Sequence, residues 1–295
     1  MPVTAWIDKR IRVIFILPCV VFILVMIVAP LGYNLYLSFH SWSMSAVKAP
    51  ELIGFENYLR LFSEKRFWDA VGRTVIFVVT ALSAQTLLGM GLAVLLNRPY
   101  KGKRLAQTLF LLPVVATPVA IGMVWKLMYE PTIGFANVLV RSAGLAPMKF
   151  LATTGIESLL SLVAVDIWEW TPMVMLMVYA GLVALPDTPY ESARIDGANA
   201  WQLFTRITLP LVSPTLLVAM MLRLIDVIKT FDIIYATTQG GPNFATENIN
   251  ILAYSTTFSY FEFGKAAAIT VLFFIVVIAI SGVFLWIRKH AEVDF

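Results

Sequence analysis

Charged side chains are scarce in this sequence, and their scarcity decides the class of protein. Asp, Glu, Lys and Arg make up 14% of the 295 residues, whereas hydrophobic residues make up 59%. Soluble globular domains carry about 25% charged residues. A chain of this length cannot bury so large an apolar excess in one soluble core. The composition therefore predicts an integral membrane protein whose solvent is the lipid bilayer.

Cysteine and histidine are also nearly absent. The single cysteine, Cys19, excludes an intrachain disulfide, and no group of residues has the spacing of a metal site. The two histidines, His40 and His290, are far apart and have no paired carboxylate or thiol motif. The phosphate loop G-x-x-x-x-G-K-[ST] is missing, since Gly264-Lys265 is followed by alanine. We expect no enzyme, metal or cofactor in this chain, and a nucleotide that drives it must be bound by another chain.

Long runs without charge locate the expected membrane spans. About 20 helical residues, at about 1.5 Å each, cross a hydrocarbon core of roughly 30 Å. Four runs of that length contain no charge, and two further runs are interrupted by a few charged residues. The predicted fold is an all-α membrane protein with a single transmembrane domain over residues 1–295. Its six expected spans lie in residues 13–47 (with a helix ending near Tyr36), 74–97, 105–125, 158–184, 207–222 and 266–287.

Basic residues set the expected orientation of the spans. Half of the 22 lysines and arginines lie in short segments that would all face one side of the membrane. The longer connections on the other side carry mixed charge. The positive-inside rule then predicts that both termini are cytoplasmic. The residues that decide it are Lys9, Arg10, Arg12, Arg98, Lys101, Lys103, Arg104, Arg194, Arg206, Arg288 and Lys289.

The connection between the fourth and fifth spans begins with strong helix signals. It reads LPDTPYESARIDGANAWQLF over residues 185–204. Thr188 is a candidate N-cap, Pro189 would occupy the first helical position, and Glu191 follows the cap by three residues. This pattern of a capping box with a proline at the start predicts a short helix.

A second short helix is expected directly after the first. Gly197 supplies a left-handed stop for the first helix. Asn199 and Gln202 then repeat the spacing of a capping box. Two short helices around a glycine form a rigid projection, which is typical of a docking element and unusual in a plain connector.

The same connection contains a long motif with fixed spacing. The pattern E-S-A-x3-G-x9-I-x-L-P resembles the EAA motif of ABC importer permeases, E-A-A-x3-G-x9-I-x-L-P. Ser192 stands where that motif has a second small residue, alanine. The positions that match are Glu191, Ala193, Gly197, Ile207, Leu209 and Pro210.

Further segments are similar to the carbohydrate-uptake branch of these permeases, and to the first of the two permeases that such importers pair. These segments are IDGA at 195–198, FDIIY at 231–235, GGP at 240–242, and Trp168 followed four residues later by Pro172. The likeness covers roughly residues 31–286.

The resemblance implies a division of labour among several chains. It implies a second homologous permease subunit, an extracytoplasmic sugar-binding protein, and two ATPase subunits that bind ATP and Mg, but no nucleic acid. It places the complex in a bacterial or archaeal cytoplasmic (inner) membrane. The segment from Glu191 to Pro210 would form a coupling helix on an ATPase subunit, with Glu191 as the contact and Gly197 as the turn. Ile207, Leu209 and Pro210 would anchor it to the fifth span.

Charged residues inside the fourth and fifth spans are the second candidate site. Asp166 and Glu169 share one helix face, as do Arg223, Asp226 and Lys229. A charge at such depth costs at least about 2.5 kcal/mol unless it faces protein or water. Two readings stay open: a structural ion pair, for example Glu169 with Arg223, or a sugar path. Candidate path residues are Asp166, Trp168, Glu169, Asp226, Phe231, Asp232 and Tyr235.

Two other classes of protein fit the sequence less well. A secondary transporter with a proton relay should show an internal repeat with broken helices, and none is visible. An intramembrane enzyme needs a convergent nucleophile and base or a metal site, to which neither histidine contributes. The cargo stays open among disaccharides, sugar alcohols, glycosides and glycerol-phosphate derivatives.

Overall fold

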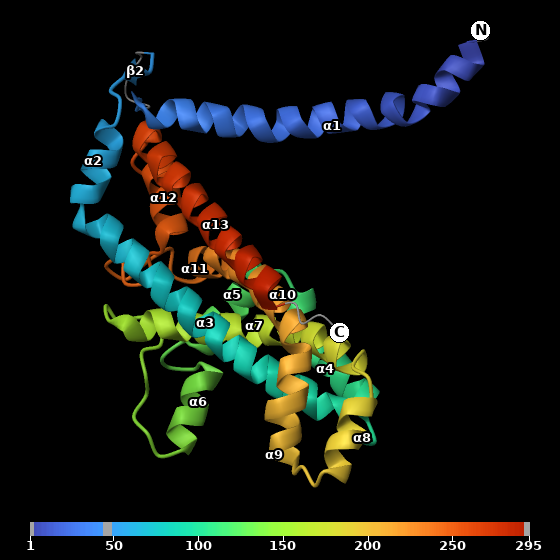
Figure 1. The fold of residues 1–295 in the computed structure, drawn as a ribbon. Coiled ribbons are helices and arrows are strands. Elements are labelled where there is room, and N and C mark those ends of the chain that lie inside the picture. The colour runs from blue at the N-terminus through green and yellow to red at the C-terminus, as the bar shows by residue number, and fades with distance from the viewer. Residues whose placement is uncertain (1–2, 44–48, 292–295) are drawn as a thin grey trace. The chain divides into compact units, whose positions relative to one another are not determined.

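Helices account for almost all of the regular structure in the computed structural model, which describes residues 3–43 and 49–291 (Figure 1). A two-stranded antiparallel pair, β1 (His40–Ser41) with β2 (Glu51–Leu52), is the one sheet in these ranges. The helices are α1 (Val3–Ser38), α2 (Glu56–Ser63), α3 (Lys65–Asn97), α4 (Lys103–Val115), α5 (Pro118–Met128), α6 (Phe135–Ser142), α7 (Ile156–Val183), α8 (Thr188–Ile195), α9 (Ala200–Leu203), a π-helical turn η1 (Phe204–Thr208), α10 (Leu209–Ile228), α11 (Asp232–Thr237), α12 (Ile249–Phe258) and α13 (Phe263–Ala291).

The expected membrane spans agree with the helices. Five helical segments in the described part of the chain are long and apolar enough to cross a bilayer, and a bent pair brings the number to six. These segments are Ile16–Ser38, Lys65–Asn97, Ile156–Val183, Ala200–Thr237 and Phe263–Ile287, with α4 and α5 as the bent pair. The two ends of the chain lie outside the described residues, so their cytoplasmic location stays a prediction.

The third span differs from the continuous helix expected over residues 105–125. The axes of α4 and α5 meet at 96°. Ala116 and Thr117 between them are extended, with ψ angles of 150° and 141°. Pro118 explains the break, because a proline disfavours the helical conformation of the residue before it and lacks the N–H that would continue the helix. The sequence contained this signal, but the uninterrupted apolar run concealed it.

The chain divides into two compact units, which we describe separately: Met1–Lys65 with Ala253–Phe274, and Arg66–Leu252 with Ile275–Phe295. In the first unit, buried Asn57 ties α2 to the end of α1. Its side-chain amide donates to the carbonyl oxygens of Ser38 and His40 at 2.9 and 3.0 Å. Lys265 forms an ion pair with Glu64 at 2.6 Å. One transmembrane domain over residues 1–295 stays a prediction.

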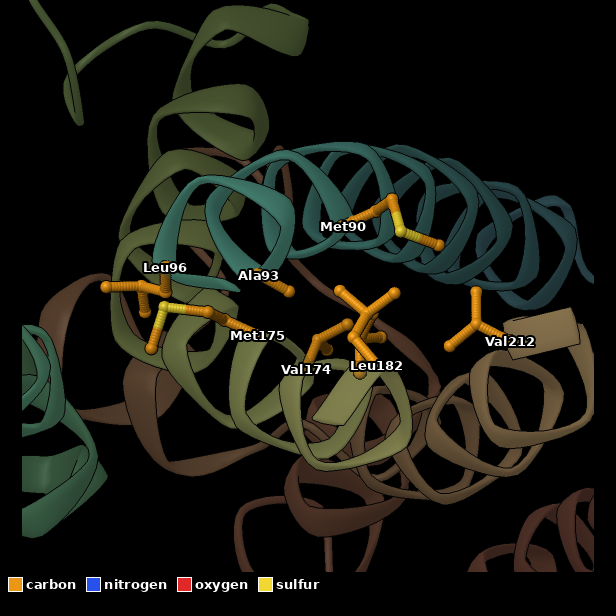
Figure 2. Packing of buried hydrophobic residues seen from close by; sticks show 8 residues of the cluster. Met90, Ala93, Leu96, Val174, Met175, Leu182 and Val212 are labelled. Atoms are coloured by element: carbon orange, nitrogen blue, oxygen red, sulfur yellow. The ribbon is translucent and has the colours of Figure 1, made fainter. Parts of the chain in front are cut away.

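In the second unit, α3, α7 and α10 pack around a buried apolar cluster (Figure 2). Because lipid chains are as apolar as leucine, such helices are held by close packing and polar contacts and gain little from the hydrophobic effect. The cluster consists of Met90, Ala93, Leu96, Val174, Met175, Val178, Leu182 and Val212. It joins the C-terminal parts of α3 and α7 to the start of α10.

Gly89 permits a close approach of α3 to α7. A Cβ atom at Gly89 would lie 2.8 Å from the Cγ1 of Val174 and 3.1 Å from the backbone nitrogen of Met175. A Cβ atom at Gly91, two residues along the same helix, would meet no atom within 4 Å. Small residues at such a crossing are typical of membrane helix pairs.

We expect Gly89→Leu to destabilise the protein and Gly91→Leu, its matched control, to be tolerated. The larger side chain at 89 must push α7 away, and overpacking of this kind costs about 1–3 kcal/mol. Thermal unfolding of the chain in detergent or nanodiscs measures the difference. Equal unfolding temperatures for the two variants would show that the helices do not depend on this contact.

Candidate functional site

The first arm of the connection after α7 is helix α8, and its start differs from the predicted capping box. The helix begins at Thr188, so that Asp187 is the N-cap, and no side chain forms a cap hydrogen bond. The backbone carbonyl of Asp187 accepts from the N–H groups of Tyr190 and Glu191 at 3.0 and 3.1 Å. The predicted cap at Thr188 is therefore wrong by one residue, although the helix itself and its early proline are present.

The residue predicted to end α8, Gly197, has the expected left-handed conformation. Gly197 has a φ angle of 82°. The N–H of Ala198 donates to the carbonyl of Ala193 at 2.9 Å, and the N–H of Gly197 donates to that of Arg194 at 3.1 Å. These two bonds define a Schellman motif, which satisfies the last carbonyls of a helix and requires a left-handed residue. Gly197 thus fixes the direction in which the chain leaves α8.

The second arm also follows the prediction. The side chain of Asn199 accepts from the N–H of Gln202, and the side chain of Gln202 accepts from the N–H of Asn199, both at 2.9 Å. This capping box opens α9, which continues through η1 into α10. The hydroxyl of Tyr190 on α8 donates to that of Thr208 at 3.1 Å, and this bond links the first short helix to the end of the second segment. We call residues 188–208 the knuckle (Figure 1).

The tip of the knuckle is apolar and exposed. Ile195 is 87% exposed and Trp201 is 71% exposed. Glu191 of the motif is exposed, and Ala193 is half-buried. Two large hydrophobic side chains held in this way on a capped and hydrogen-bonded element are characteristic of a docking surface, in which such anchors contribute most of the binding energy.

The base of the knuckle joins the helix core. Phe204 and Leu209 pack against the apolar cluster formed by α3, α7 and α10. Ile207 is half-buried and Pro210 is exposed near the start of α10. The contiguous helical segments α9, η1 and α10 connect Trp201 at the tip to this core.

A buried polar network lies between the same three helices. The guanidinium of Arg223 on α10 pairs with the carboxylate of Asp166 on α7, and its Nε donates to the side-chain oxygen of Gln85 on α3 at 2.8 Å. The amide of Gln85 donates to the carboxylate of Asp166 at 2.8 Å and to its backbone oxygen at 3.0 Å. The ring of Trp170 lies 5.1 Å from the guanidinium. All three polar side chains are buried.

The structural ion pair proposed between Glu169 and Arg223 is wrong, because Asp166 is the partner of Arg223. Glu169 is fully buried, and its two carboxylate oxygens have no hydrogen-bond partner among the described residues. Gln85 was missed altogether. The available signal was a single glutamine in the middle of an otherwise apolar span, where an unsatisfied amide would be costly.

The other path candidates are more accessible. Asp226 pairs with Lys229 at 3.6 Å, and both side chains are about half exposed. The rings of Phe231 and Tyr235 are stacked, with centroids 5.1 Å apart, and Asp232 is exposed in the first turn of α11.

Trp168 lies elsewhere, in an apolar groove between α3, α4, α5 and α7, with its ring 5.5 Å from that of Trp125. The path candidates therefore divide into a buried group on α7 and an accessible group on α10 and α11, with Trp168 in contact with α5.

We expect Asp166→Asn to destabilise the protein strongly, whereas Asp226→Asn serves as a matched control with little effect. Removing one partner of a buried ion pair costs about 3–5 kcal/mol because the other charge is stranded. An exposed pair contributes about 0–1 kcal/mol. The yield of folded protein and the unfolding temperature measure the contrast. Glu169→Gln removes no hydrogen bond and should be tolerated better than Asp166→Asn; the reverse order would contradict the network.

These features define a multi-span membrane protein with an exposed, apolar-tipped knuckle between its fourth and fifth spans. The chain belongs to the family of binding-protein-dependent transport system inner membrane components, whose family model matches residues 62–292.

Relatives over nearly the whole chain are permease proteins. A probable ABC transporter permease protein y4oQ from Sinorhizobium fredii is 36% identical over 94% of this chain and 91% of its own length. The trehalose/maltose transport system permease protein MalF from Thermococcus litoralis is 34% identical over 96% of this chain and 95% of its own length. The trehalose transport system permease protein SugA from Mycobacterium tuberculosis is 30% identical, over 94% and 88% respectively.

A solved structure shares the fold. A chain of a bacterial alginate ABC transporter, in complex with an alginate pentasaccharide-bound periplasmic protein, superposes with a TM-score of 0.83. The two chains are 22% identical, and the match covers 99% of each. Both the family and the fold therefore agree with the permease fold expected from the motif at Glu191–Pro210.

Proposed function

We propose that this chain is the membrane-spanning permease subunit of an ATP-driven importer for a sugar or sugar derivative. The observation that carries the proposal is the knuckle, whose exposed apolar tip residues Ile195 and Trp201 fit a surface for a partner such as a separate ATPase subunit. Family membership and relatives named for trehalose and maltose transport support the choice of cargo. The chain itself performs no chemistry in this proposal.

The proposed complex has five chains: this permease and four partner chains. A second homologous permease would complete the pathway, an extracytoplasmic binding protein would deliver the sugar, and two ATPase subunits would bind ATP with Mg. The knuckle and both termini would lie in the cytoplasm of a bacterial or archaeal cell, and the positive charge of the short connections supports this orientation.

The knuckle would transmit a displacement of an ATPase subunit to α10. Its two arms are fixed to each other by the Schellman motif at Gly197, the capping box and the bond between Tyr190 and Thr208. An ATPase subunit that moves the tip would therefore displace α10 as a rigid body, which is a common way of transmitting conformational change.

The accessible group on α10 and α11 is the proposed part of the sugar path. Sugars have hydroxyl groups, which can donate hydrogen bonds to carboxylates, and an apolar C–H face, which stacks on aromatic rings. Asp226 and Asp232 supply the first kind of contact, and the stacked rings of Phe231 and Tyr235 supply the second. Asp166 and Glu169 are buried and act as structural groups in this proposal.

We expect Gly197→Val to abolish ATP-driven uptake and co-purification of the ATPase while the chain still inserts. A β-branched residue in the left-handed region costs about 1–2 kcal/mol and would redirect α9. Gly102→Val is the matched control, because Gly102 has a φ angle of 86° in the turn before α4 and likewise has free space around it.

The comparison separates coupling from stability. Both variants carry similar backbone strain, so both should lose a similar amount of stability. Only the variant at Gly197 should lose the ATPase subunit and uptake. A Gly197→Val protein that transports at the level of the Gly102→Val protein would refute the coupling role.

We expect Tyr235→Ala to lower sugar uptake severalfold at normal yield of the complex. The side chain is partly exposed and stacks on Phe231, so its removal leaves a stacking surface incomplete without stranding a buried charge. Uptake of labelled sugar and stimulation of ATP hydrolysis by the loaded binding protein are measured together. Wild-type uptake by the variant would remove Tyr235 from the proposed path.

A further inference from the structure

Helix α6, in the connection between the bent third span and α7, has its apolar face turned outward. Phe135, Val138 and Leu139 are each between 49% and 55% exposed. Their spacing of three and four residues places them on one face of the helix. Asn137, on the other side, is fully buried. This is the reverse of a surface helix in a soluble protein, whose apolar stripe faces the core.

The apolar surface continues on both sides of the helix. Ile133 is 84% exposed before it, and Leu145 and Met148 are 63% and 49% exposed after it. We call these three residues, together with Phe135, Val138 and Leu139, the connector face. Soluble proteins rarely leave so many large apolar side chains uncovered on one short segment.

The connector face is held by an ordered framework. The side chain of Asn137 donates to the carbonyl of Met148 at 2.9 Å and accepts from its N–H at 2.8 Å. Arg141 donates to the carbonyl of Thr132 at 2.7 Å. Polar groups of the connection are thus paired internally, as a segment near the hydrocarbon region requires.

Glu130 fixes the start of the connection in the same way. Its carboxylate accepts from the N–H of Ile133 at 2.7 Å and from the hydroxyl and N–H of Thr132 at 2.6 and 2.8 Å. These hydrogen bonds, first that from Ile133, hold the pKa of Glu130 below its usual range. The carboxylate therefore remains a charged cap for this turn.

The connection begins close to the end of the membrane region. The hydroxyl of Tyr129 donates to the carbonyl of Ser161 at 3.1 Å, five residues inside the end of α7 at Ile156. At 1.5 Å per residue, the hydroxyl of Tyr129 lies about 8 Å from that end, measured along the axis of α7. The connection therefore starts beside the first turns of α7.

The charge of the connection suits the boundary between lipid headgroups and acyl chains. The sequence has no acidic residue between Glu130 and Glu157, whereas Arg141 and Lys149 are both exposed. Basic residues beside a large apolar surface are typical of segments that lie at the lipid interface, where they meet phosphate groups.

We propose that the connector face is an interfacial lipid anchor, with its apolar side chains in the outer part of the acyl region and Arg141 and Lys149 at the phosphates. The anchor would fix the outer end of the bent span α4–α5. A lipid occupant accounts for three features together: the start of the connection beside the end of α7, the absence of acidic residues, and the internal hydrogen bonds of Asn137 and Arg141. A protein partner would account only for the exposed apolar side chains.

Spin labelling of the full chain in nanodiscs of mixed zwitterionic and anionic phospholipid tests the anchor. Cys19 is the one cysteine, so Cys19→Ser gives a background for the single replacements Leu139→Cys and Val138→Cys. Lys101→Cys, at an exposed turn position between α3 and α4, is the water reference. We expect a water-soluble nickel relaxant to reach the labels at 138 and 139 severalfold less than the label at 101, and oxygen to reach them more.

Two results would overturn the anchor. Nickel access at 138 and 139 equal to that at 101 would place the connector face in water. Protection that arises only when the partner permease, ATPase or binding protein is added would assign the face to a protein. Neither measurement involves transport, so a failure of the anchor is distinguishable from a failure of the proposed importer function.

Discussion

The buried network of Arg223, Asp166 and Gln85 is the interaction on which the helix arrangement depends. It joins one buried side chain from each of α10, α7 and α3. Apolar packing alone discriminates poorly among rotations of helices in lipid, whereas a charge without its partner is costly there. The network therefore selects one relative rotation of the three helices, and the close contact at Gly89 then becomes geometrically available.

Arg223 of this network lies on α10, the helix that continues from the knuckle. Leu209 begins α10 at the base of the knuckle, and Arg223 follows 14 residues later, about 21 Å along the axis. In the proposed importer, a displacement of the tip by an ATPase subunit reaches Arg223 through one uninterrupted helix. Asp226 and the aromatic pair on α11 come directly after it.

The two breaks in helical structure, at Gly197 and at Ala116–Thr117, have different consequences. The left-handed residue Gly197 turns the chain between two short helices on the exposed side of the protein, where the backbone needs a definite direction. The extended pair Ala116–Thr117 bends a membrane span by 96°, so that α5 packs against α11 instead of completing a straight crossing. The bend leaves the outer end of the span without the usual length of helix, and the ordered connection with α6 follows it.

The sequence by itself determined the features that depend on neighbouring residues. Charge-free runs located the spans, and the capping box at Asn199 and the stop at Gly197 were predictable because each is formed within a few residues. The chemical class of the protein followed from a motif whose spacing is also local. The predicted N-cap at Thr188 was wrong by one residue, because several backbone arrangements satisfy the same short pattern.

Only the tertiary structure decided which carboxylate meets Arg223. Asp166 and Glu169 are three residues apart on one helix face, so the choice depends on the rotation of α7 against α3 and α10, which no local pattern encodes. The outward face of α6 was decided in the same way, since a short amphipathic pattern does not reveal which side the rest of the protein covers. Contacts between residues far apart in the chain fix both, because such contacts depend on the packing of whole helices and not on the residues beside them.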